Sequence, residues 1–180
     1  MVSAIIISQN THSVNEANLR RIVEALHSAR VLDVVVVGSS FPSELATVLN
    51  SMAVKYEYSH SDDECSMIAA GIASLMQDEL HGVLIFSVHQ LRISQAILVD
   101  LLHQFWISHK QIVVCSINGK REFTIVADAL FNEVQQTSAN NSLESFIALH
   151  ADELLEVSFD ENGNRILHQP IVNIQPLTDE

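Results

Sequence analysis

Glycine is scarce in this sequence, with only five among 180 residues and none before Gly38. The apolar run 2–7 is typical of a buried first strand, and it continues into Ser8-Gln9-Asn10 rather than into glycine. A tight glycine turn at such a point lets backbone N–H groups approach a phosphate closely. The sequence therefore lacks the usual phosphate-binding turn after its first strand.

Basic residues are also few: nine Lys and Arg stand against 22 Asp and Glu, which gives a formal net charge of −13. From Glu122 to the end, eleven acidic residues are accompanied by a single basic one, Arg165. Such a surface repels nucleic acid and anionic lipid, so we expect neither as a partner.

The two cysteines, Cys65 and Cys115, do not form a disulfide framework, and we expect Cys115 to be a buried thiol inside an apolar strand. No apolar run approaches the roughly 20 residues of a membrane span. No charged segment precedes the first apolar run, as it would in a secretory signal. We therefore expect a cytoplasmic protein.

Short strand and helix signals alternate along the chain, and 48% of the residues are hydrophobic. This alternation predicts a single α/β domain over 1–180, with a three-layer, mainly parallel sheet covered by helices on both faces. Asn118-Gly119 predicts a type I′ turn and hence an antiparallel hairpin within that sheet. We expect strands at 2–7, 34–38, 54–58, 83–86, 112–117, 123–126, 154–159 and 171–174, and helices at 15–30, 42–49, 61–76, 94–109, 128–135 and 142–149.

The acidic stretch Ser61-Asp62-Asp63-Glu64 has the pattern of a capping box, with Ser61 as the N-cap of the third helix. The neighbouring His60 and Cys65 leave two alternatives open, a metal cluster over 60–65 or a nucleophilic thiol. Capping accounts for the carboxylates without a metal, so we favour the structural interpretation.

Four stretches follow one another in an order that resembles the molybdenum-cofactor nucleotidyltransferase family, close to its cytidylyltransferase branch. They are the strand at 4–7, the helix start at 63–72, the segment 86–91 and the hairpin Gly119-Lys120-Arg121. The resemblance implies a glycosyltransferase-A-like fold of the nucleotide-diphospho-sugar transferase type. It also implies transfer of a nucleotide from CTP or GTP to a phosphorylated pterin with Mg²⁺.

The sequence departs from this family at the residues that carry the chemistry. Ser8-Gln9-Asn10 replaces the family's Ala-Ala-Gly, His89 stands where a metal-binding aspartate is found, and Gln175 aligns with a second metal carboxylate. Mg²⁺ prefers carboxylate oxygens, and each lost charge beside it costs about 4 kcal/mol at an effective dielectric constant of about 20. We therefore expect the metal-dependent transfer to be lost.

The sequence thus predicts a catalytically degenerate nucleotidyltransferase-like domain that binds a small molecule or contacts another protein. We assign it no catalytic residue, metal or cofactor, although an active Mg²⁺-dependent transferase with displaced catalytic residues stays open as the alternative. The expected ligand is a nucleoside, a sugar or a pterin-like compound, held at the carboxyl ends of the strands. The residues expected to bind it are Ser8, Gln9, Asn10, His89 and Gln90.

The helix expected at 94–109 is apolar on more than one face. Two interpretations follow: burial in the core, or an interface with a second copy of the chain or with another protein.

Overall fold

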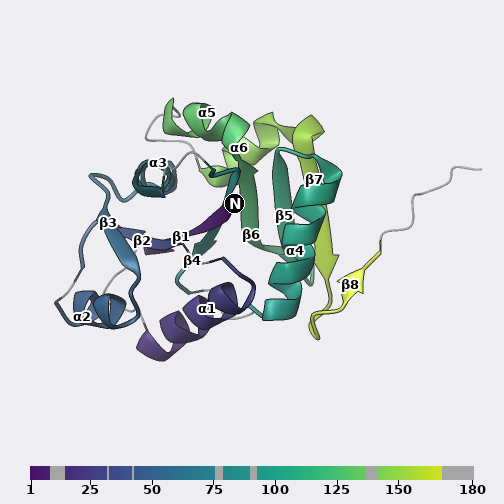
Figure 1. Ribbon diagram of the computed structural model, residues 1–180. Coiled ribbons are helices and arrows are strands. Elements are labelled where there is room, and N and C mark those ends of the chain that lie inside the picture. Colours follow the sequence, from purple (N-terminus) through teal and green to yellow (C-terminus); the bar gives the residue numbers. More distant parts are fainter. Residues whose placement is uncertain are drawn as a thin grey trace, which may run out of the picture.

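The computed structural model describes residues 1–8, 15–31, 33–41, 43–75, 79–89, 93–136 and 142–167. These residues form one eight-stranded sheet with the strand order β3-β2-β1-β4-β6-β5-β7-β8 (Figure 1). The strands are β1 Val2–Ser8, β2 Val34–Gly38, β3 Lys55–Tyr58, β4 Gly82–Ser87, β5 Ile112–Ile117, β6 Lys120–Ala127, β7 Leu154–Phe159 and β8 Arg165–Ile166.

Most neighbouring strands are parallel, as the alternating pattern predicted. The strands β3, β2, β1 and β4 pair in parallel, and so do β5 and β7. Strand β6 runs antiparallel between β4 and β5, and β8 runs antiparallel along β7. The expected α/β sheet with an antiparallel hairpin is confirmed.

Helices cover both faces of this sheet (Figure 1). They are α1 Glu16–Ser28, α2 Ser43–Ser51, α3 Glu64–Leu75, α4 Gln95–Ser108, α5 Phe131–Gln136 and α6 Leu143–Leu149, with short 3-10 turns at Asp128–Leu130 and Ala151–Glu153. Because side chains alternate along a strand, Ala4 and Ile6 pack with α1, α2 and α4, while Ile5 and Ile7 pack with α3, α5 and α6. Two apolar cores therefore sandwich the sheet.

The hairpin between β5 and β6 forms where Asn118-Gly119 predicts it. Both residues have positive φ angles, 52° and 74°, which a type I′ turn requires. The turn inserts β6 between β4 and β5, with Thr124 opposite Ile85 of β4. The hairpin thus brings the start of β6 beside the carboxyl end of β4.

The N-terminus of α3 differs from the expected capping box. The helix begins at Glu64, and Asp63 is its cap, because Oδ1 of Asp63 accepts the Ser66 N–H at 2.8 Å. Ser61 instead accepts the Asp63 N–H at 3.3 Å, and Glu64 turns toward α6. The assignment of Ser61 as the N-cap is therefore wrong, since the Asp63 carboxylate is the acceptor nearer to the first turn.

Helix α4 is buried in the core on one face and exposes apolar side chains on another. Its buried residues pack against the sheet, whereas Val99, Trp106 and Ile107 are each about half exposed. An interface at this face stays a prediction, as does the single domain over 1–180.

Several other expectations from the sequence can be compared with the structure. Cys115 is buried and both cysteines are free thiols, as expected. A turn at 160–163 follows β7, and Gly163 takes a positive φ of 81° before β8. The predicted strand at 171–174, Gln175 and the first residue expected for α2, Pro42, lie outside the described residues. None of the helices in the described part of the chain is long and apolar enough to cross a membrane.

Candidate functional site

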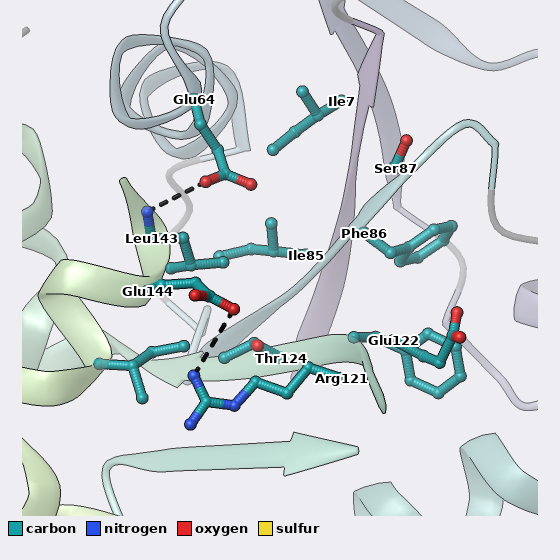
Figure 2. A pocket seen from close by; sticks show the side chains of 12 residues that line it. Ile7, Glu64, Ile85, Phe86, Ser87, Arg121, Glu122, Thr124, Leu143 and Glu144 are labelled. Atoms are coloured by element: carbon teal, nitrogen blue, oxygen red, sulfur yellow. Dashed lines mark hydrogen bonds and ion pairs between the residues drawn. The ribbon is translucent and has the colours of Figure 1, made fainter. Parts of the chain in front are cut away.

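A cavity of about 260 Å³ lies at the carboxyl ends of β1 and β4, next to the first residues of β6. The N-termini of α3 and α6 form its opposite wall (Figure 2). Open α/β sheets bind ligands at this edge, because the loops and helix N-termini converge there. The apolar lining residues are Ile7, Ile85, Phe86, Phe123, Leu143 and Ile147, and the polar ones are Glu64, Ser87, Arg121, Glu122, Thr124 and Glu144.

Because successive side chains of a strand point to opposite faces of the sheet, only alternate residues form the floor of the cavity. Ile7 and Ile85 belong to the core on the α3 and α6 side of the sheet. Thr124 is directly opposite Ile85 in the β4–β6 ladder. Its side chain therefore extends toward the same side and into the cavity.

Glu64 ties the two helices of the cavity wall together. Its Oε2 accepts the Leu143 N–H at 3.0 Å, across a sequence separation of 79 residues (Figure 2). Leu143 is the first residue of α6, so the carboxylate satisfies a backbone donor that the helix itself leaves unpaired. The negative charge also lies at the N-terminal, positive end of the helix dipole.

Arg121 is the one cation that lines the cavity within the described part of the chain, and it faces Glu144. Its guanidinium nitrogen lies 3.9 Å from the Glu144 carboxylate, with side-chain exposures of 39% and 77% (Figure 2). An ion pair this exposed contributes little to stability. The Glu144 carboxylate nevertheless partly neutralises the positive charge that Arg121 would offer to a phosphate ligand.

The N-terminus of α3 carries negative charge close to the cavity. Burial opposes ionisation of Asp63, but hydrogen bonds from Ser61 and Ser66 outweigh it and hold the pKa of this carboxyl below its ordinary value. Burial, Glu64 and Asp63 together raise the pKa of the Cys65 thiol to about 11. Cys65 therefore remains a neutral thiol at physiological pH and is a poor nucleophile.

The carboxylates that line the cavity are the candidate metal ligands among the described residues. Within the ranges that the structure describes, no three His, Cys, Asp or Glu side chains gather into a metal-binding group. Glu64 is bound to the α6 backbone, and Glu144 faces Arg121. Two of the carboxylates that line the cavity are thus already in contact with other groups of the protein.

Two of the five predicted ligand-binding residues lie within the described chain. Ser8 ends β1 and is fully buried, and its hydroxyl has no hydrogen-bond partner. His89 is exposed two residues beyond β4, where its N–H donates to the Ser87 hydroxyl at 3.3 Å. The Val88 N–H donates to the Ile7 carbonyl at 2.9 Å, so the structure brings these two strand ends together.

Gln9, Asn10 and Gln90 lie outside the described residues. The five residues are predicted to bind a ligand because they follow strand ends. The cavity, however, is lined mainly by the first residues of β6 and of the helices α3 and α6. A role for the five in ligand binding stays a prediction.

Glu64, Arg121, Thr124 and Glu144 were not among the predicted site residues. A signal existed for Arg121, since Gly119-Lys120-Arg121 matches the family hairpin, and Glu64 lies in the second motif stretch. His150 follows α6, where its Nε2 lies 3.0 Å from the Glu133 carboxylate and its ring packs on Phe146. The structure gives His150 a packing role on α6, away from the lining of the cavity.

Comparisons with known proteins agree with this architecture. The family model of the MobA-like NTP transferase domain matches residues 14–156. The match begins after the segment 8–10, where the sequence departs from the family motif. No curated protein matches the sequence.

Solved structures share the fold at low sequence identity. Rv0371c from Mycobacterium tuberculosis H37Rv superposes with a TM-score of 0.70 at 8% identity, covering 89% of this chain and 88% of that one. A 4-diphosphocytidyl-2C-methyl-D-erythritol synthase from Anaerococcus prevotii gives 0.66 at 9%, covering 94% and 91%. A nucleotidyl transferase from Methanothermobacter thermautotroptrophicus gives 0.63 at 15%, covering 88% and 87%.

Proposed function

The chain belongs to the MobA-like NTP transferase family, and we propose that it binds a small molecule in the cavity without metal-dependent nucleotidyl transfer. The main observation behind the proposal is that carboxylates and the guanidinium of the cavity already have partners within the protein. Glu64 accepts from the α6 backbone, and Arg121 faces Glu144. These groups are therefore not arranged to hold a metal and a triphosphate.

The charge of the cavity supports this proposal. Among the described residues, the charged groups that line it are the carboxylates of Glu64, Glu122 and Glu144 and the guanidinium of Arg121. A triphosphate brings several negative charges, which a site with an excess of carboxylates repels unless a metal ion compensates them. The net charge of −13 adds a repulsive field over the whole molecule.

The size and lining of the cavity support a compact ligand. About 260 Å³ lies slightly below the roughly 300–1,000 Å³ of typical small-molecule sites, so the cavity suits a ligand much smaller than a dinucleotide. Apolar walls from Ile85 and Phe123 suit a ring face, and polar groups at the rim suit ring substituents. A nucleoside, a sugar or a pterin-like compound fits this description.

The rival proposal is an active Mg²⁺-dependent transferase with displaced catalytic residues. It requires a metal held by the carboxylates of the cavity. Glu64 has one oxygen bound to the Leu143 N–H and can offer only the other, and Glu144 faces Arg121. We therefore favour the binding function.

The test is a titration of the ¹⁵N-labelled protein with cytidine, guanosine, glucose and pterin in the absence of metal. We expect at least one of them to shift the amide resonances of Ser87, Thr124 and Leu143, which line the cavity. Residues on the far side of α1, such as Glu24, serve as the internal control and should not move. Shifts confined to other surfaces, or none with all four compounds, would contradict binding in this cavity.

A further inference from the structure

The hydroxyl of Thr124 is available to a ligand in the cavity. Thr124 is only 4% exposed, and it lines the cavity on β6 beside Ile85 (Figure 2). Its hydroxyl makes no hydrogen bond with any residue in the ranges that the structure describes. This hydroxyl can therefore donate to or accept from a group that enters the cavity.

Glu64 offers an acceptor in the same cavity. Its Oε2 is committed to the Leu143 N–H, whereas Oε1 has no hydrogen-bond partner among the described residues. One free carboxylate oxygen suits a donor that binds at a single point. A guanidinium prefers both oxygens of a carboxylate, so a compact ammonium matches this site better.

We propose that the ligand of this cavity carries a primary ammonium group on a small apolar body. The ammonium group binds Glu64 Oε1 as a charge-assisted donor, and the Thr124 hydroxyl supplies a second acceptor in the cavity. The apolar body packs on Ile7, Ile85 and Ile147, which line the same space. The excess of carboxylates favours a cation over an anion. This inference rests on the proposed binding of a small molecule in this cavity, and it replaces the uncharged nucleoside, sugar or pterin by an ammonium compound as the expected ligand.

Three probes with one apolar ring test the inference. Benzylammonium, benzyl alcohol and benzoate differ in charge but share a benzyl or phenyl body, and each is titrated into ¹⁵N-labelled protein. The Leu143 amide is the direct reporter, because its N–H is bound to the carboxylate that receives the ammonium. We expect benzylammonium to shift the Leu143 and Thr124 amides, benzyl alcohol to bind about tenfold more weakly or worse, and benzoate to leave both unchanged.

Matched variants separate the charge of Glu64 from its structural role. Glu64→Gln keeps an oxygen for the Leu143 N–H and removes the charge, so we expect benzylammonium binding to weaken about tenfold or more. Thr124→Val keeps the shape of the side chain and should weaken binding severalfold. Glu16→Gln removes an equal charge on α1, where Glu16 pairs with Arg20, and should leave binding unchanged.

Each outcome decides between the alternatives. Equal binding of benzylammonium and benzyl alcohol by the unmodified protein overturns the ammonium inference but leaves a small-molecule cavity standing. Absence of shifts with all three probes, or tight binding by Glu64→Gln, overturns the inference as well. The comparison of probes on the unmodified protein remains decisive even if a variant fails to fold. Mg²⁺-dependent turnover of a nucleotide would instead overturn the proposed function, irrespective of these titrations.

Discussion

At Gly71, helix α3 packs directly against the side chain of Ile5 in the sheet. A Cβ added at Gly71 would lie 2.8 Å from side-chain atoms of Ile5, which is fully buried in the central strand β1. We predict that Gly71→Ala destabilises the protein by about 1–3 kcal/mol through overpacking, despite the gain in helix propensity of up to about 1 kcal/mol. Urea unfolding followed by circular dichroism measures the difference.

Ser74→Ala, three residues later on the same helix, is the matched control. Ser74 is half-buried and its substitution adds no atoms, so we expect a change in unfolding free energy within about 0.5 kcal/mol. If Gly71→Ala proves as stable as the unmodified protein, α3 does not lie as close to Ile5 as the structure places it.

A second prediction about a single residue concerns the ionisation and reactivity of the Cys65 thiol. Burial, Glu64 and Asp63 raise its pKa to about 11, whereas an unfolded cysteine has a pKa of about 8.5. The thiol therefore contributes stability that is fully present below about pH 8.5 and is lost as the pH rises toward 11. We also expect iodoacetamide at pH 8 to alkylate Cys65 only when urea unfolds the chain, as followed by mass spectrometry. Rapid alkylation of the folded protein at pH 8 would contradict the assigned environment.

Individual site residues were the least predictable part of the protein. Arg121 was noticed in the hairpin motif, and Glu64 was assigned to a capping box. Neither was placed at the cavity, because the partner of Glu64 is Leu143, 79 residues away. Local patterns encode caps and turns, whereas such a contact depends on how two helices meet across the sheet.

Helix α3 depends on its cap, which is Asp63. Removing an N-cap acceptor costs about 1 kcal/mol, so we predict this loss for Asp63→Ala and a much smaller one for Asp63→Asn. Although burial opposes ionisation, hydrogen bonds from Ser61 and Ser66 lower the pKa of Asp63 below its unfolded value. The contribution of the charge is therefore present above about pH 4 and is lost as the pH falls.

Urea unfolding at pH 7 and near pH 3 measures both effects of the Asp63 substitutions. The difference between the unmodified protein and Asp63→Asn should shrink at the lower pH. Ser61→Ala is the comparison that separates the two candidate caps. A larger loss for Ser61→Ala than for Asp63→Ala would restore the capping box that the sequence predicted.

The elements themselves were predictable because their signals are local. The β-branched run of β2 and the helical spacing of α1 each predict one element, and Asn118-Gly119 predicts the hairpin turn. The position of β6 between β4 and β5 was not predicted, although it determines where Arg121 and Thr124 lie. Strand order depends on pairing between distant segments, so a single sequence contains little direct information on it.

The net charge of −13 acts on the whole molecule. With 22 acidic and nine basic side chains, repulsion between surface carboxylates opposes the compact state. Salt screens exposed charges over about 10 Å at 0.1 M ionic strength. We therefore predict that raising NaCl from about 0.02 to 0.2 M increases the urea concentration at half-unfolding. An equal osmolar addition of sucrose provides the uncharged comparison, and a decrease with NaCl would show that attractive ion pairs dominate instead.

The most direct test of the central claim is isothermal titration calorimetry of CTP and GTP with and without Mg²⁺ at physiological salt. The cavity combines an excess of carboxylates with one paired guanidinium, so we predict no heat of nucleotide binding that depends on Mg²⁺. A nucleotidyltransferase known to bind CTP serves as the positive control. Saturable binding of either nucleotide that requires Mg²⁺ would contradict the account, because it would show that the protein assembles a metal and triphosphate site.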